Sequence, residues 1–158
     1  MIFATCGSSH LPFERLMQAL AVLPADELIV QHGPAQPPPA ARAVPFLSYG
    51  EVVELIEEAD VVVSHAGVGS IICAIRAGHT PIVFPRFKRY SETVDDHQAE
   101  LATALEQRGT VRVTWTPEDL LEAIRSIPPR GAAVASDAVR LNAAVRAAIH
   151  GQALAPAG

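Results

Sequence analysis

The sequence predicts an α/β fold: a single Rossmann-like domain in which helices flank a parallel sheet of about six strands. Three observations lead to this expectation. Short apolar runs alternate with helical segments along most of the chain. The run DVVVSH, residues 60–65, has the unbroken valines of a strand buried on both faces. The chain has 158 residues, of which 49% are apolar, which is enough for one domain with a substantial core.

The first elements follow from hydrophobic spacing. An apolar run at residues 2–6 predicts the first strand, and leucines on one face of residues 12–23 predict a helix. Residues 27–31 predict a second strand. The proline-rich stretch after it predicts a loop, because proline cannot pair within a sheet.

The third strand is expected in VPFLS, residues 44–48. Ser48 and Glu51 then have the spacing of a capping box, in which each side chain bonds the backbone of the other residue. This pattern predicts a helix that begins after Ser48 and ends at about residue 59.

The centre of the chain predicts two strands and a helix between them. Residues 60–65 are the fourth strand, and residues 69–77 form a helix that Gly78 ends. TPIVFP, residues 80–85, predicts the fifth strand.

The last third predicts a long helix over residues 94–108 and a sixth strand over residues 111–115. Thr116 and Pro117 are typical of a helix start and predict a helix to Ser126. A final alanine-rich helix is expected over residues 136–150. We expect residues 1–150 to form the domain and residues 151–158 to be a flexible tail.

Composition excludes several classes of function. The net charge of −5 and the lack of a basic run give no reason to expect a nucleic-acid surface. Cys6 and Cys73 lie far apart without the spacing of a zinc site or a disulfide framework, so we expect small core residues. The start of the chain does not resemble a signal peptide, and no apolar stretch has transmembrane length. We therefore expect a soluble cytoplasmic protein that can dock on a membrane-bound partner.

The loop SHAGVGS, residues 64–70, follows the most buried strand and leads into a helix. A helix start presents free N–H groups and a positive dipole end, which suits a phosphate. Gly67 and Gly69 would let the backbone approach the anion, and Ser70 and His65 would donate hydrogen bonds. Alternatively, the glycines only make a tight turn, Ser70 caps the helix and His65 packs beneath the loop.

Two known phosphate motifs do not fit this loop. The third glycine of the dinucleotide fingerprint would fall at Ile72, and the chain contains no Gly-Lys-Ser/Thr. The loop is therefore not expected to bind NAD, or ATP in the usual way.

The stretch YSETVDDHQAEL, residues 90–101, carries a second cluster: Asp95, Asp96, His97 and Gln98. Acceptors, an imidazole and an amide beside a phosphate site suit a polyhydroxyl group such as a sugar. Alternatively, the two aspartates are favourable charges in the first turn of a helix. A divalent metal is a further alternative, but neighbouring helical residues point in different directions, so no metal site is expected.

Other residues are expected at the same rim. Gly7 and Ser8 end the first strand and form a smaller nest of backbone N–H groups. Arg86, Lys88 and Arg89 in PRFKRY belong either to a solvated loop or to a site for a second anion or a lipid headgroup.

Three stretches together resemble a known family: FATCGSSHLPFERL, ADVVVSHAGVGSIICAIRAGHTPIVFP and DDHQAELATALEQRG. They are similar to the donor-binding C-terminal domain of GT-B glycosyltransferases of family 28, over the chain from the first strand to about residue 126. Within this family, the chain most resembles the short subunits of split enzymes. These are the subunits of bacterial exopolysaccharide β-glycosyltransferases and of the eukaryotic GlcNAc transferase acting on dolichol-diphosphate-GlcNAc.

The resemblance implies half of a GT-B fold and a nucleotide-diphosphate-sugar donor, usually UDP-linked. It assigns the donor diphosphate to Gly7, Ser8, His65, Gly67, Gly69 and Ser70. It assigns the donor sugar to Asp96, His97 and Gln98. Many relatives carry a ribose-binding glutamate where this chain has Cys73, so ribose recognition is expected to differ.

The resemblance also implies a function for the chain. A membrane-anchored subunit would supply the acceptor site and hold this chain at the cytoplasmic face of the membrane. The pair would transfer a sugar, with inversion, from a UDP-sugar to a polyprenyl-diphosphate-linked glycan in exopolysaccharide biosynthesis. No cofactor and no obligatory metal are expected.

Two points stay open at this stage. The general base is not evident: His10 is a weak candidate, and the partner is another source. The alternative function is a non-catalytic nucleotide-sugar-binding or regulatory module, or a homodimer that merely uses the fold.

Overall fold

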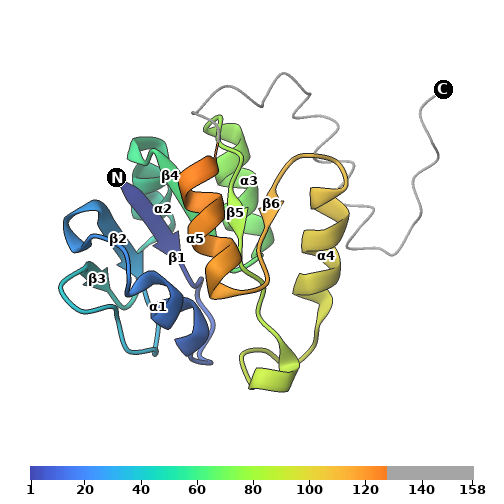
Figure 1. Cartoon of the computed structure of the whole chain (residues 1–158), viewed down its shortest axis with the longest axis horizontal. Helices are drawn as coiled ribbons and strands as arrows, with labels where there is room; N and C mark the ends of the chain where they lie inside the picture. Colours follow the sequence, from blue (N-terminus) through green and yellow to red (C-terminus); the bar gives the residue numbers. More distant parts are fainter. Residues whose placement is uncertain (128–158) are drawn as a thin grey trace.

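The computed structural model describes residues 1–127, and these contain a six-stranded, fully parallel sheet with the order β3-β2-β1-β4-β5-β6 (Figure 1). The strands are β1 Ile2–Thr5, β2 Leu28–Gln31, β3 Arg42–Val44, β4 Val61–Ser64, β5 Ile82–Val83 and β6 Arg112–Val113. The α-helices are α1 Glu14–Leu20, α2 Tyr49–Glu58, α3 Val68–Arg76, α4 His97–Glu106 and α5 Pro117–Ser126. Two short 3-10 helices are η1 Ala25–Glu27 and η2 Lys88–Tyr90. The predicted fold class is confirmed.

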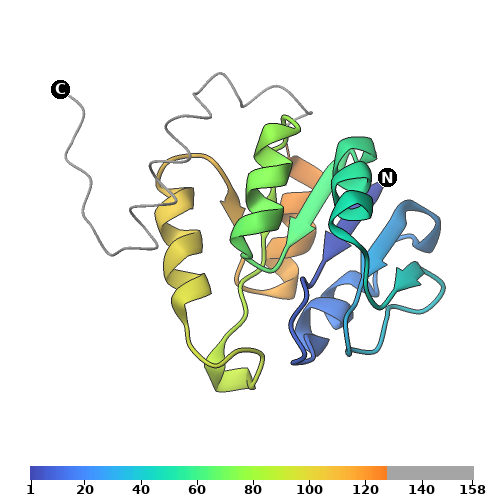
Figure 2. The same cartoon turned by 180° about the vertical axis from the view of Figure 1, so that it is seen from behind.

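Helices cover both faces of the sheet because side chains alternate along its central strands. On β1, Ile2 and Ala4 pack with α1 and α5, whereas Phe3 packs with α2 and α3. Figure 2 shows α2 and α3 side by side on the second face. Val83 of β5 joins the core that α3 shares with α4.

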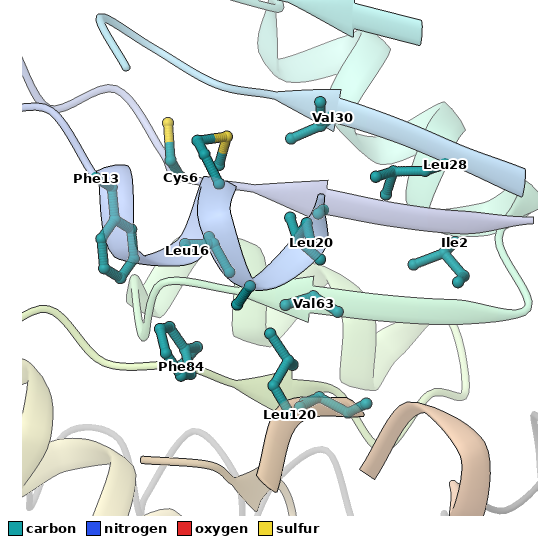
Figure 3. Packing of buried hydrophobic residues seen from close by; sticks show 14 of the residues in the cluster. Ile2, Cys6, Phe13, Leu16, Leu20, Leu28, Val30, Val63, Phe84 and Leu120 are labelled. Atoms are coloured by element: carbon teal, nitrogen blue, oxygen red, sulfur yellow. The ribbon is translucent and has the colours of Figure 1, made fainter. Parts of the chain in front are cut away.

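The core beneath α1 is shown in Figure 3, where Leu16 and Leu20 of the helix lie over the central strands. Phe13 and Phe84 stack beside them with ring centroids 6.0 Å apart. Burying a leucine side chain stabilises the fold by about 2 kcal/mol. Because Phe13 and Phe84 come from the loops after β1 and β5, this packing also positions those loops.

Two predicted helix starts agree with the structure. Ser48 and Glu51 form the expected capping box at the start of α2. Thr116 and Asp119 form a second capping box at α5, with Pro117 in the first turn.

Other boundaries differ from the prediction. The third strand was expected at residues 44–48, but β3 is Arg42–Val44, because Pro45 has no N–H to donate to the ladder. Helix α4 begins only at His97, whose N–H bonds the Asp95 side chain 3.1 Å away in the preceding turn. The predicted helix at residues 136–150 and the tail at residues 151–158 lie outside the described residues.

The strand order places a topological switch point between β1 and β4. The chain runs from β1 outward to β2 and β3, then returns to β4 on the other side of β1. Thr5 and Ser64 are paired at the carboxyl ends of these two strands. Parallel α/β sheets bind ligands at this place, just beyond the strand ends.

Among residues 1–127, no helix combines the length and the apolar character that crossing a membrane would require.

Candidate functional site

The loops after β1 and β4 meet at the switch point around His65. Its imidazole lies between Gly7 and Gly67 and fills the space that a side chain at either position would need. A Cβ added to Gly7 would be 2.5 Å from Nε2, and a Cβ added to Gly67 would be 2.5 Å from Cε1. Gly7 also has a φ of +75°, which side chains rarely adopt. Both glycines are therefore needed to seat the ring.

His65 is neutral at pH 7. Burial of its ring and the positive charge of Arg86 lower its pKa to about 4, and a hydrogen bond with the Thr5 backbone opposes this only partly. The residue keeps some exposed surface, but its Nδ1 is buried and has no partner within residues 1–127. His65 can thus offer a hydrogen bond to a ligand, but no charge.

The loop after β1 is fixed by a small hydrogen-bond network. The Gly7 N–H donates to the Thr5 hydroxyl at 3.0 Å, and the Gln31 amide donates to the Gly7 carbonyl at 3.2 Å. Thr5 in turn donates to Gln31 at 2.9 Å. Ser8 and His10 follow on the same loop and are exposed.

Helix α3 begins at the same place with Gly67 as its N-cap and no side-chain cap. Ser70 Oγ donates to the Gly67 carbonyl at 3.0 Å and lies 2.6 Å from Ser64 Oγ. Since a hydroxyl has one proton, Ser64 must donate to Ser70 in this arrangement. The hydroxyl proton of Ser70 therefore holds the loop, and the donors left for an anion are the backbone N–H groups of the first turn.

Gly69 marks the open side of this helix start. It is exposed, and a Cβ added there would meet nothing within 4 Å. A ligand could therefore reach the backbone of the first turn from this side.

A cavity of about 460 Å³ brings the two predicted motifs together, with a volume in the usual range for small-molecule sites. It is lined by Ala66, Gly67, Val68, His97, Gln98, Glu100, Leu101 and Ala104. The loop after β4 thus faces the start of α4, although the two are about 30 residues apart in sequence.

Gln98 leaves an unmet hydrogen-bond acceptor at this cavity. Its Oε1 is buried and has no partner in the described part of the chain. Buried polar atoms of this kind are rare in proteins. A ligand hydroxyl or amide could satisfy it.

His97 and Asp96, which precede Gln98, are both more exposed than Gln98. His97 is exposed, and its Nδ1 lies 3.4 Å from a carboxylate oxygen of Glu100. Asp96 is exposed and accepts a hydrogen bond from the Lys88 N–H at 2.9 Å, and it does not line the cavity. Among residues 1–127, no group of three or more histidine, cysteine or acidic side chains gathers where a metal could bind.

The prediction that Arg86 lies in a solvated loop or at a site for an anion or a lipid headgroup is wrong. Its side chain is 1% exposed and lies beneath the loops, bonded to main-chain carbonyls, whereas Lys88 and Arg89 on η2 are exposed. The sequence did not indicate this, because the partners of Arg86 are main-chain carbonyls, and all but that of Glu92 belong to residues distant in the chain.

Sequence reasoning also missed Tyr49. Its hydroxyl lies 3.4 Å from Sγ of Cys73 on the neighbouring helix, and this hydrogen bond raises the pKa of Tyr49. Tyr49 is 72% exposed. Cys73 thus has an exposed phenol beside it.

Comparisons with known proteins agree with this architecture. Residues 1–149 match the glycosyltransferase family 28 C-terminal domain. A stretch of 73 residues is 42% identical to the UDP-N-acetylglucosamine transferase subunit ALG13 of Cryptococcus neoformans var. neoformans serotype D, in two strains. The stretch is 45% of this chain and 34% of the relative, so the match spans about a third of the length of the curated relatives.

Solved structures show the same fold. A solution structure of ALG13 superposes with a TM-score of 0.60 at 18% identity, covering 94% of this chain and 96% of the other. MurG of Acinetobacter baumannii gives 0.54 at 22% identity, with 95% of this chain matched to 45% of the enzyme. The glycotransferase of kitacinnamycin gives 0.54 at 26% identity, with 96% of this chain matched to 40% of that protein.

Proposed function

This chain belongs to the glycosyltransferase family 28 C-terminal domain family, and we propose that it binds the UDP-sugar donor of a transferase whose acceptor site lies on a separate, membrane-anchored subunit. One observation carries the proposal: the uncapped start of α3, which follows β4 at the switch point, and the start of α4 with Gln98 line one cavity. This arrangement suits a ligand with a diphosphate at one end and a sugar at the other.

In this proposal the diphosphate lies against the first turn of α3. The backbone there supplies N–H donors and the positive dipole end, and Gly69 leaves room for the anion, whereas the space beside Gly67 is filled by the His65 ring. His65 seats the loop and offers a neutral hydrogen bond, while Ser70 holds the loop closed on Gly67. Gly7, which contacts the His65 ring, and Ser8 are proposed to border the diphosphate from the loop after β1.

The sugar lies at the start of α4. Gln98 would accept a hydrogen bond from the sugar through its unpartnered oxygen, and His97 is a second polar group on the cavity wall. Asp96 is proposed to contribute to the sugar site without contacting the sugar, since its carboxylate accepts a hydrogen bond from the Lys88 backbone N–H.

The reaction is an inverting displacement. An acceptor hydroxyl attacks the anomeric carbon, the bond from that carbon to the UDP oxygen breaks, and a base takes the hydroxyl proton. The helix start stabilises the negative charge that develops on the departing UDP. The base is either His10, on the exposed loop after β1, or a residue of the partner.

The partner and the acceptor are proposed by similarity. The Cryptococcus relative is described as a transferase subunit for UDP-N-acetylglucosamine, which supports a UDP-sugar donor and a second subunit. We propose a polyprenyl-diphosphate-linked glycan as acceptor, a role in exopolysaccharide biosynthesis, and a location at the cytoplasmic face of the membrane through the partner. Residues 1–150 would form the donor-binding domain, with residues 151–158 as a tail.

A transfer assay tests this proposal. The purified chain is mixed with UDP-sugars and a lipid-linked acceptor, with and without a candidate membrane-anchored partner subunit. Transfer that requires both proteins is the expected result. UDP-sugar binding without transfer under either condition would instead support a non-catalytic or regulatory module.

A further inference from the structure

We infer that Arg86 is a buried positive charge that attracts the donor diphosphate to the switch point without touching it. This inference rests on the proposed function and extends it to a residue outside the cavity. Arg86 would be a positioning residue that also sets the local potential.

Arg86 joins the two loops that border the site. Its Nη2 donates to the Cys6 carbonyl at 2.9 Å, at the end of β1. Its Nη1 donates to the Glu92 carbonyl at 2.8 Å and to the Leu11 carbonyl at 3.0 Å. The guanidinium also lies 4.5 Å from the centre of the Phe13 ring. The charge is therefore held in one place.

The side-chain charges around Arg86 do not cancel. The carboxylate of Glu92 pairs with Arg15 through two bonds of 3.1 and 2.9 Å and also accepts from the Phe87 N–H at 3.0 Å. Glu92 hydrogen-bonds Arg86 only through its main-chain carbonyl, and its carboxylate charge acts on Arg86 without a direct bond. The cluster of Arg15, Arg86 and Glu92 thus holds two guanidinium groups and one carboxylate.

Arg86 also has an unused donor. Its Nε is buried and has no hydrogen-bond partner within residues 1–127. Burying a charge without a counter-charge is costly, and an opposite charge nearby offsets that cost. The chain as a whole carries −5, so this local excess of positive charge runs against its overall balance.

The excess charge lies next to the proposed anion site. Arg86 binds the carbonyl of Cys6, which precedes Gly7, and Gly7 abuts the ring of His65. The charge of Arg86 is already felt by that ring, whose pKa it helps to lower. Burial raises the pKa of the Cys6 thiol, so Cys6 does not supply the missing anion at pH 7. A donor diphosphate at the start of α3 would supply it.

The test compares three ligands on matched variants by calorimetry: UDP, inorganic pyrophosphate and uridine. Arg86→Met should bind UDP and pyrophosphate about tenfold more weakly, or ~1.4 kcal/mol, and should bind uridine as the wild type does. Arg86→Lys keeps the charge and should retain most of the UDP affinity. Arg108→Met removes the same formal charge from an exposed position at the end of α4 and should bind all three ligands unchanged.

A second readout does not depend on any ligand. In Arg86→Met the pKa of His65, followed by NMR of its ring, should rise from about 4, whereas in Arg86→Lys it should stay low. A purely structural role for Arg86 would not separate charged from uncharged ligands.

If Arg86→Met does not fold, Arg15→Met addresses the same question. That change frees the Glu92 carboxylate to neutralise Arg86, and UDP affinity should again fall while uridine binding stays. A folded variant of either kind that binds UDP like the wild type overturns the inference and leaves the proposed function standing. A wild-type chain that binds no UDP overturns both.

Discussion

The imidazole of His65 occupies the space in which a side chain at Gly67 would have to lie. Gly67 has an ordinary φ of −70°, so what forbids a side chain there is the ring and not the backbone conformation. The same ring abuts Gly7 on the neighbouring loop. The His65 ring thus excludes a side chain from one position in each of the two loops at the carboxyl ends of the central strands.

Gly67→Ala should therefore destabilise the fold through His65. We expect a loss of roughly 1–3 kcal/mol in the free energy of unfolding, as for overpacked cores. In a His65→Ala background the same change should cost much less, because the space is then free. Urea denaturation of the four proteins in this double-mutant cycle measures the coupling. Equal costs in both backgrounds would contradict the contact.

Stability should fall in acid because His65 is held neutral. Its pKa is about 4 in the folded state against an ordinary value of 6.5, so the unfolded chain binds the proton more readily. The stabilisation is complete above pH 6.5 and is lost as the pH falls through 4. The loss should reach roughly 2–3 kcal/mol.

Carboxylates titrate in the same acid range, so the wild type must be compared with His65→Ala. The difference between their unfolding free energies at pH 7 and pH 4 isolates the imidazole. A difference that does not change with pH would mean that His65 titrates normally.

Gly69→Leu should weaken binding of the UDP-sugar donor without destabilising the fold. A side chain there meets nothing within 4 Å, so the melting temperature should stay close to that of the wild type, but the leucine would cover the first turn of α3. UDP affinity in calorimetry should fall at least about tenfold. Gly50 is the matched control, since it is also the second residue of a helix, α2, with open space around it. Gly50→Leu should leave UDP binding intact, and equal affinities in both variants would remove the loop from the site.

Gln98→Leu should affect the sugar more than the nucleotide. The variant loses the amide that lines the cavity, so a UDP-sugar should lose about 1 kcal/mol of its binding energy while UDP itself binds unchanged. Competition calorimetry with the two ligands separates these effects. Gln107, at the far end of α4, provides a control in Gln107→Leu. Parallel losses for UDP and UDP-sugar would reject the assignment of Gln98 to the sugar.

Features with a local signal could be predicted from the sequence. The valines of β4 marked the centre of the sheet, and Ser48 with Glu51 marked the start of α2. The parallel order then placed the loop after β4 and the start of α4 at one edge, where the cavity contains both. Each of these depends on neighbouring residues or on a general rule for parallel sheets.

Features that depend on contacts between residues far apart in the chain could not be predicted from the sequence. Arg86 lies close to Lys88 and Arg89 in the sequence and was expected in a solvated loop or at an anion or lipid-headgroup site, but it is bonded to the carbonyl of Cys6, 80 positions away. Backbone carbonyls have no identity in the sequence, so nothing there marks them as partners. The contact between Tyr49 and Cys73 likewise arises from packing between separate helices.

The central claim is that the start of α3 and the start of α4 with Gln98 bind one donor. The most direct measurement is a titration of the isotope-labelled chain with UDP-N-acetylglucosamine, followed by NMR of the amide groups. We expect the N–H signals of Val68, Gly69 and Ser70 and the side-chain amide of Gln98 to move together along one saturating curve. Shifts confined to another part of the chain, or none at millimolar ligand, would contradict the account.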